Sequence, residues 1–214
     1  MNSRRAGLVL LLAGLTLTAM YHAPELLPDW AHGGVEVTAR VLAKMSYRAE
    51  PEGVLAIVEV PVATVPDAAT LVLVAVGIEK PGNLGALART ADAAGADALL
   101  IAEAATDPWN PNAIRASTGA VFTLPIVEAR LDTVLALPLQ KVAAVVDAPT
   151  AHTAVDLRTP SAILVGAEDS GLDERWREAA DHQVAIAMHA HSVDSLNTAT
   201  AAAIVLFEAV RQRG

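Results

Sequence analysis

The clearest pattern in the chain is an alternation of short apolar runs with longer amphipathic stretches, beginning near residue 69. Leu71–Val76 is a continuous apolar run of strand length, which is typical of a strand buried on both faces of a sheet. Asn83–Ala94 has the pattern of a helix, with Gly95 suited to end it. Further strands are predicted over Ala98–Ala102, Lys141–Val146, Ile163–Val165 and Gln183–Ala187, and further helices over Ile114–Ala120, Glu174–Ala180 and Ser195–Arg211. This order predicts an α/β fold with a mostly parallel sheet.

The chain opens with an apolar run over residues 6–20, preceded by two arginines. Such a run is typical of a secretory signal, and residues 1–23 would then export or anchor the protein. The run is too short and too interrupted by Gly and Thr for a comfortable transmembrane helix. The interpretation that we favour is a buried helix over Arg4–Ala13, followed by a strand over Leu15–Tyr21.

A second change of pattern divides the chain. A helix over Thr38–Met45 and a strand over Val54–Val60 complete the first segment. Pro61, Pro66 and Asp67 then form a stretch typical of a linker. The sequence therefore predicts a small domain over residues 1–62 and a larger one over residues 69–214.

Composition narrows the possible functions. The chain of 214 residues has no cysteine, which excludes disulfides, thiolate zinc sites and cysteine nucleophiles and fits the cytoplasm. Aromatic residues make up 3%, too few for a surface that stacks many unpaired bases. The formal net charge is −9, although a nucleic-acid enzyme usually gains affinity by neutralising phosphates. An RNA partner would therefore require a basic surface concentrated near the site.

Three loops that follow predicted strands carry unusual polar residues, and open parallel sheets bind ligands beyond the carboxyl ends of their strands. The first loop leads through a Pro-Gly turn into a helix that Asn83 could cap, and Arg89 lies six residues further on. Taken alone, Arg89 is better explained by exposure to solvent or by pairing with Glu79 or Asp92. The loop lacks the Gly-Lys-Ser/Thr of a phosphate-binding loop.

The second loop is Gly166-Ala167-Glu168-Asp169-Ser170-Gly171-Leu172. Glycines allow backbone to approach a ligand closely, and here two of them bracket Glu168 and Asp169. We do not predict a metal, because no histidine or third acidic residue has suitable spacing. Taken alone, the segment is also explained as an ordinary tight turn.

The third loop contains His189, His191 and Asp194, followed by Ser195-Leu196-Asn197. Ser195 is a fair helix N-cap, whereas Asn197 within the first turn has poor helix propensity and needs another explanation. A Ser-His-Asp hydrolase is disfavoured because the Gly-x-Ser-x-Gly elbow is absent. The histidines are better explained as exposed loop residues than as zinc ligands.

Together, in this order and spacing, the loops resemble the three motifs of the SpoU family of RNA 2′-O-methyltransferases, within the SPOUT superfamily. The matching segments are Asn83–Ala86 with Arg89–Ala91, Gly166–Glu168 with Gly171–Leu172, and Ile186 and Met188 with Ser195–Asn197. Asn110–Ala120 also resembles the family, and the likeness covers about residues 71–213. Parts of residues 13–56 resemble the family's small substrate-binding domain, which is similar to ribosomal protein L30e. The resemblance implies that residues 1–62 are a partial domain of this kind, with the chain beginning inside it.

The resemblance also implies properties that the pattern of residues does not show. The C-terminal chain would form a deep trefoil knot whose loops bind S-adenosylmethionine, and the protein would be a homodimer with the site near the subunit interface. Gly166, Ile186 and Leu196 would bind this cofactor through backbone groups, and Met188 would line its pocket. The partner would be structured RNA, either rRNA or tRNA, with no membrane and no metal involved.

Arg89 takes the place of the family's proposed catalytic residue. An arginine keeps its proton at neutral pH, so we expect Arg89 to orient the phosphate beside the target ribose rather than to act as a plain base. Asn83, Ser195 and Asn197 would position Arg89 and the ribose, and Glu168 would hold the loops.

Two features separate the chain from the family's pattern. Ala187 replaces the usual Pro, and His189–Ser192 replaces a loop that often contains Gly, which puts cofactor affinity in question. The alternative function is a catalytically weak or inactive RNA-binding or dimer module of the same fold, and a third hypothesis is an exported or anchored protein.

Overall fold

A computed structural model describes residues 15–26, 34–46, 48–189 and 194–214. The chain divides into two compact units, Met1–Pro61 and Val62–Gly214. The helix predicted over Arg4–Ala13 lies outside the described residues. No helix in the described ranges is long and apolar enough to cross a membrane.

The first unit contains a small mixed sheet in the order β2-β1-β3. Its elements are β1 (Leu17–His22), η1 (Pro24–Leu26), β2 (Val35–Glu36), α2 (Ala39–Met45) and β3 (Val54–Val58). Strand β1 pairs with β2 in parallel and with β3 in antiparallel orientation. Thr38 begins α2, because its side chain accepts a hydrogen bond from the backbone N–H of Val41. The strands and the helix predicted within the described part of this segment are present, and β2 was not predicted.

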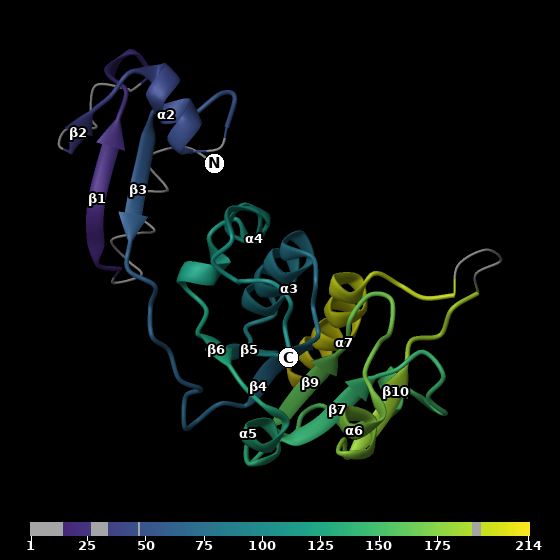
Figure 1. The fold of residues 1–214 in the computed structure, drawn as a ribbon. Helices are drawn as coiled ribbons and strands as arrows, with labels where there is room; N and C mark the ends of the chain where they lie inside the picture. The colour runs from purple at the N-terminus through teal and green to yellow at the C-terminus, as the bar shows by residue number, and fades with distance from the viewer. Residues whose placement is uncertain (1–14, 27–33, 47, 190–193) are drawn as a thin grey trace. The chain divides into compact units, whose positions relative to one another are not determined.

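The second unit is built on a sheet of seven parallel strands in the order β6-β5-β4-β9-β7-β10-β8 (Figure 1). The strands are β4 (Leu71–Val76), β5 (Ala98–Ala102), β6 (Ile126–Glu128), β7 (Gln140–Ala144), β8 (Thr150–Ala151), β9 (Ser161–Val165) and β10 (His182–Ala185). The helices are α3 (Pro81–Ala93), α4 (Pro111–Ser117), η2 (Ala120–Phe122), α5 (Leu131–Leu135), η3 (His152–Ala154), α6 (Glu174–Glu178) and α7 (Thr198–Arg213). The α/β prediction is confirmed, and the sheet is parallel throughout.

Alternate residues of the central strand β4 belong to two separate cores, as the two faces of a pleated strand require. Leu71, Leu73 and Ala75 pack with residues of α3 and α7 on one face of the sheet. Val72, Val74 and Val76 pack on the other face with residues around α5 and α6. Because β4 is buried on both faces, its sequence is continuously apolar rather than alternating.

Two late strands lie between earlier ones in this sheet. β9 pairs with both β4 and β7, and β10 pairs with both β7 and β8. The last part of the chain therefore runs between segments that precede it in sequence. This arrangement is compatible with the trefoil knot, which stays a prediction.

Three helix starts in this unit differ from those predicted, and one of them is that of α4, which spans Pro111–Ser117 rather than Ile114–Ala120. Helix α3 begins at Pro81 with Lys80 at the N-cap, so Asn83 lies in its first turn and does not cap it. Proline at the first helical position is favourable because its missing N–H would have no partner there. Helix α7 begins at Thr198, and Asn197 rather than Ser195 is its N-cap. The presence of Asn197, a residue with poor helix propensity, is thereby explained, because it precedes the helix and caps it.

Candidate active site

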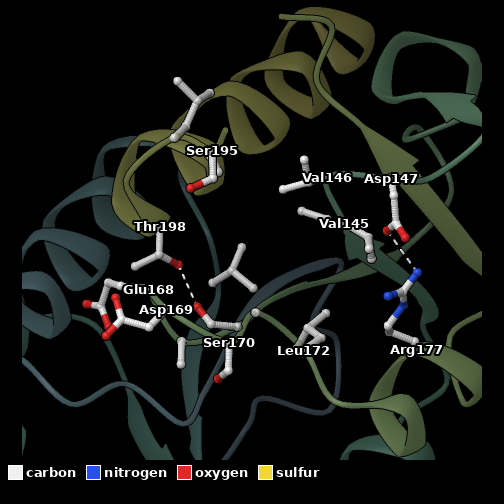
Figure 2. Close-up of a pocket in the computed structure, with 17 residues that line it drawn as sticks. Val145, Val146, Asp147, Glu168, Asp169, Ser170, Leu172, Arg177, Ser195 and Thr198 are labelled. Atoms are coloured by element: carbon white, nitrogen blue, oxygen red, sulfur yellow. Dashed lines mark hydrogen bonds and ion pairs between the residues drawn. The ribbon is translucent and has the colours of Figure 1, made fainter. Parts of the chain in front are cut away.

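A pocket of about 250 Å³ lies at the carboxyl ends of β7 and β9, beside the start of α7 (Figure 2). Parallel sheets bind ligands at this edge. The pocket is lined by Ala144, Val145, Val146, Asp147, Val165, Gly166, Ala167, Glu168, Asp169, Ser170, Gly171, Leu172, Arg177, Ser195, Leu196, Thr198 and Ala201. The segments that follow β7 and β9 and the segment at the start of α7 are far apart in sequence, and together they supply one concave surface.

The floor of the pocket requires glycine at residue 166. A side chain there would overlap the backbone of Gly171 and the N–H of Leu172, so the two halves of the loop approach more closely than any other residue allows. The loop is closed by a hydrogen bond from the Gly171 N–H to the Ala167 carbonyl, 3.0 Å long. The buried Thr198 hydroxyl donates to the Gly166 carbonyl at 2.9 Å and fixes the start of α7 against this loop.

Negative charge predominates in the pocket. Its lining includes the carboxylates of Asp147, Glu168 and Asp169 and one cationic side chain, that of Arg177. Arg177 forms an ion pair with Asp147 at 2.9 Å, and Figure 2 shows this pair on the opposite side of the pocket from Glu168 and Asp169. The pocket thus suits a ligand that carries positive charge or several hydrogen-bond donors.

Helix α6, which supplies Arg177, is capped at its N-terminus. Asp173 caps the helix by accepting a hydrogen bond from the backbone N–H of Trp176 at 3.1 Å. The Arg175 guanidinium beside Asp173 holds the pKa of that carboxyl below its usual range. Trp176 is fully buried, so the helix is fixed by both a cap and a core side chain.

A chain of amide and carboxylate groups joins the three loops. The Asn83 side-chain amide donates to Oε1 of Glu168, and its oxygen accepts a hydrogen bond from Nδ2 of Asn197 at 3.3 Å. The Asn197 oxygen in turn accepts from the backbone N–H of Ala199 at 3.0 Å, which caps α7. Each asparagine is used through both its donor and its acceptor, so neither can be replaced by a residue with only one of them.

The structure gathers most, but not all, of the nine predicted site residues. Gly166, Glu168, Ser195 and Leu196 line the pocket, and Asn83 and Asn197 connect to it through Glu168. Ile186 and Met188 are half-buried but are absent from the described lining, and Ile186 packs instead against the core beneath α3 and α7.

Arg89 does not line the pocket. It is exposed on α3, six residues beyond Asn83, and it forms no ion pair with any described carboxylate. The alternative in which Arg89 pairs with Glu79 or Asp92 is therefore not observed, whereas exposure to solvent is.

The structure also brings in residues that the sequence analysis did not single out. Val145, Val146 and Asp147 follow β7 and form one wall of the pocket, and Thr198 supports its floor. The strand predicted over Lys141–Val146 ends at Ala144, so its last two valines belong to the pocket loop. Asp147 directly follows the predicted end of this strand at Val146, and an acidic residue at that place is the one sequence signal that could have found this wall.

The fold and the pocket define a class: a parallel α/β protein with a glycine-bearing ligand site beyond its strand ends. The family model of the SpoU rRNA Methylase family matches residues 70–207, and the chain therefore belongs to this family. The family prediction is confirmed.

Relatives agree with this assignment in sequence and in structure. The chain is 39% identical over 143 residues, 62% of its length, to the 23S rRNA (uridine(2479)-2′-O)-methyltransferase of Streptomyces viridochromogenes, and the match spans 50% of that protein. It is 36% identical over 195 residues to the 23S rRNA (guanosine-2′-O-)-methyltransferase RlmB of Vibrio parahaemolyticus, covering 87% of this chain and 75% of the relative. The crystal structure of the SpoU methyltransferase AviRb from Streptomyces viridochromogenes in complex with AdoMet has a TM-score of 0.85 at 29% identity, covering 98% of this chain and 88% of that one.

Proposed function

We propose that this chain transfers a methyl group from S-adenosylmethionine to a ribose 2′-hydroxyl of structured RNA, with 23S rRNA as the first substrate to test. The observation that carries the proposal is the joining of all three motifs at one pocket. Asn83 from the first motif binds Glu168 from the second and Asn197 from the third. Both 23S rRNA relatives named above are described as 2′-O-methyltransferases, which supports rRNA over tRNA for this chain.

The pocket has the chemistry that S-adenosylmethionine requires. The sulfonium and amino groups of this molecule are cationic, and three carboxylates line the pocket. Val145, Val146 and Leu196 offer apolar surface for a flat adenine ring. A side chain at Gly171 would meet no heavy atom within 4 Å, so its backbone borders open space. We therefore assign Gly166, Leu196 and the backbone of this loop to cofactor binding.

Ile186 and Met188 are also assigned to cofactor binding. Both follow β10, the neighbour of β7 in the sheet, and they precede Ser195 and Leu196 in the same loop. Any contribution from them reaches the cofactor from outside the described lining of the pocket.

The protein contributes to the reaction by positioning the ribose and by stabilising the charge that develops on its 2′-oxygen. The cofactor supplies an activated methyl group on a positively charged sulfur. Ser195 and Asn197 hold the ribose at the mouth of the pocket, and Glu168 fixes Asn83 so that its amide keeps one orientation. Arg89 binds the phosphate next to the target ribose and stabilises the negative charge that develops on the 2′-oxygen as its proton passes to an oxygen of that phosphate or to Arg89 itself.

Three further properties belong to this proposal. The chain acts as a homodimer, and the exposed position of Arg89 outside its own pocket supports a site completed near a subunit interface. The C-terminal part of the sheet forms the trefoil knot. Residues 1–62 form an L30e-like domain that binds the RNA, for which the small mixed sheet of the first unit provides support.

The test is methyl transfer from labelled S-adenosylmethionine to 23S rRNA, followed by mapping of ribose 2′-O-methyl groups by mass spectrometry. Arg89→Ala is expected to lower the rate by roughly 100-fold or more, because it removes charge stabilisation at the reacting oxygen. Its affinity for S-adenosylhomocysteine should remain that of the wild type. Arg158→Ala is the control, since this arginine pairs with Asp156 on the surface.

Two results would contradict the proposal. Loss of cofactor binding in Arg89→Ala, with the fold intact by circular dichroism, would remove the role given to Arg89. A wild-type protein that binds RNA but neither binds the cofactor at millimolar concentration nor methylates RNA would be the inactive binding module instead.

A further inference from the structure

The lysines and arginines of residues 62–214 fall into two groups. Most of them are held by the protein itself, through a carboxylate or through backbone carbonyls. These are Arg130, Lys141, Arg158, Arg175, Arg177, Arg211 and Arg213. The remaining three, Lys80, Arg89 and Arg115, are exposed and have no hydrogen-bond or ion-pair partner among the described residues.

The three unpartnered cations all lie on two adjacent helices. Lys80 is the N-cap of α3, Arg89 lies in α3, and Arg115 lies in α4. Figure 1 shows α4 beside α3 on the same side of the sheet. The two backbones touch at Gly85, where any side chain would overlap the Ala113 carbonyl.

This close contact places Arg89 and Arg115 near each other. Arg89 follows Gly85 by four residues, one helical turn or about 6 Å along the axis. Arg115 is the direct neighbour of Ala116, whose methyl group lies against Gly85. Each guanidinium therefore extends from a position within about one turn of the helix contact.

Acidic neighbours do not cancel this charge. Glu79 precedes Lys80 and Asp92 follows Arg89 by three residues, and both acids are exposed. Neither lies within ion-pair distance of a described lysine or arginine, and Asp92 instead accepts a hydrogen bond from the Thr123 hydroxyl at 3.4 Å. Elsewhere in the described part of this unit, each lysine and arginine side chain is held by a carboxylate or by backbone carbonyls, so the cationic side chains without a partner are those of α3 and α4.

We propose that Lys80 and Arg115 flank Arg89 as contacts for RNA phosphates, so that the substrate backbone crosses α3 and α4. The proposal rests on the proposed function, since it names the surface that this activity would use. Guanidinium groups without a protein partner are free to bind phosphate oxygens in pairs. The net charge of −9 does not by itself exclude RNA binding, because a local group of cations without protein partners matters more than the total charge, and here these cations lie on two adjacent helices.

The proposal assigns a function to the stretch Asn110–Ala120, which the cofactor pocket leaves unexplained. Asn110 caps α4 by accepting a hydrogen bond from the Asn112 N–H at 2.9 Å, and Ala113 packs against α3. The segment thus builds a short, fixed helix whose exposed side presents Arg115.

The experiment measures binding of the full-length protein to deproteinised 23S rRNA at several salt concentrations, with Arg115→Ala and Lys80→Ala. Each phosphate contact contributes about 0.7–0.9 to the slope of log affinity against log salt concentration. Each variant is expected to lower that slope by roughly one contact and to weaken binding by roughly threefold to tenfold. In methylation assays the apparent KM for RNA should rise, while affinity for S-adenosylhomocysteine stays at the wild-type value.

Arg130→Ala is the matched control, because this arginine is also exposed but already pairs with Asp132 at 3.3 Å. An Arg115→Ala protein that methylates RNA with the wild-type affinity and salt slope would overturn the proposal. So would an equal loss in Arg130→Ala, since the effect would then be one of overall charge. Failure of the proposed function has a different result: RNA binding that depends on Arg115, without methylation by the wild type.

Discussion

At the scale of single residues, Asn197 shows why two polar atoms on one side chain are needed at the site. Its oxygen caps α7 through the Ala199 N–H, and its amide nitrogen donates to Asn83. The first contact stabilises the start of helix α7, and the second holds Asn83 in place at the active site. Substitutions can separate the two, because several residues cap helices but few donate a hydrogen bond as well.

We expect Asn197→Asp and Asn197→Ala to differ in a characteristic way. Aspartate retains the cap, so the unfolding temperature should stay within about 2 °C of the wild type. It has no amide donor for Asn83 and adds a negative charge near Glu168, so methylation should fall by roughly 10- to 100-fold. Alanine also loses the cap, worth about 1 kcal/mol, and should unfold about 2–4 °C lower. Equal activity of Asn197→Asp and wild type would show that Asn197 serves only as a cap.

The residue scale also shows what the sequence could and could not predict of the site. Gly166, Glu168, Ser195 and Leu196 were assigned from their motifs, and they do line one pocket. Asn197 was placed inside the helix because Ser195 and Asn197 are both good caps, and local sequence cannot choose between them. The choice is made by a distant contact, the hydrogen bond from Thr198 to the Gly166 carbonyl. Asp147 was missed because the valines before it resemble a continuing strand.

At the scale of elements, strands stabilised by burial of a long apolar run are predicted more accurately than short strands stabilised by pairing with a neighbour. The bounds of β4 and β5 match the prediction at both ends, because continuous apolar runs in a parallel sheet end where burial ends. Short elements such as β6 and β8 were not predicted, since three or two residues carry too little pattern. Their conformation depends on pairing with β5 and β10, which only the folded chain provides.

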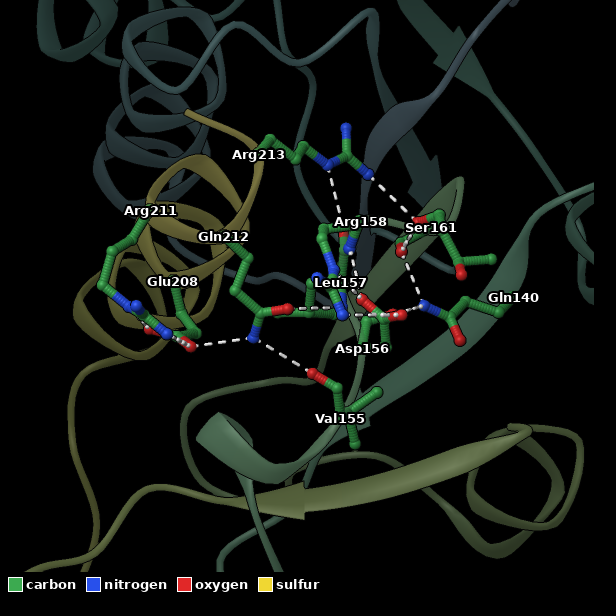
Figure 3. A network of polar contacts seen from close by, with 11 residues as sticks. Gln140, Val155, Asp156, Leu157, Arg158, Ser161, Glu208, Arg211, Gln212 and Arg213 are labelled. Carbon is green, nitrogen blue, oxygen red and sulfur yellow. Dashed lines mark hydrogen bonds and ion pairs between the residues drawn. The ribbon is translucent and has the colours of Figure 1, made fainter.

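The last turn of α7 illustrates an element fixed by polar contacts (Figure 3). Glu208 accepts hydrogen bonds from Arg211 at 2.7 and 2.8 Å and from the Gln212 amide at 2.8 Å. Gln212 also donates to the Val155 carbonyl, and Arg213 donates to the carbonyls of Leu157, Thr159 and Thr70. The helix end is thereby joined to the segments that precede β4 and β9. Burial lowers the pKa of Arg213 from its ordinary value.

This network predicts a pH dependence of stability. The Arg211 and Gln212 side chains lower the pKa of Glu208 from about 4.5 to about 2. Because the folded state binds this proton less readily than the unfolded chain, Glu208 contributes its full stability above pH 4.5 and loses it as the pH falls to about 2. Glu208→Gln should unfold roughly 2–4 °C below wild type at pH 6, and this gap should close near pH 2.

Thermal unfolding followed by circular dichroism at both pH values measures the gap. Asp132→Asn is the control, because its partner Arg130 is 85% exposed and such surface pairs contribute little. A gap of the same size at both pH values would mean that Glu208 acts through packing and not through its charge.

At the scale of the whole molecule, the chain divides into two units that differ in content. Val62–Gly214 contains the seven-stranded sheet, both of its cores, the pocket and all nine predicted site residues. The described part of Met1–Pro61 contains the small sheet, the short η1 and one α-helix, α2, which carries Arg40 and Lys44. If the first unit is the RNA-binding domain, cofactor binding and RNA binding should be separable by cutting the chain between the units.

We therefore expect residues 62–214, expressed alone, to unfold cooperatively and to bind S-adenosylhomocysteine within about twofold of the full chain, because their core and pocket are self-contained. RNA affinity should fall by roughly tenfold or more, since two linked binding surfaces hold one RNA more tightly than either does alone. Calorimetry with S-adenosylhomocysteine and filter binding with 23S rRNA measure the two quantities on the same preparations. Full RNA affinity in the shortened chain would show that the first unit is not a substrate-binding domain. Loss of cofactor binding, with the fold retained, would show that the pocket depends on residues 1–61.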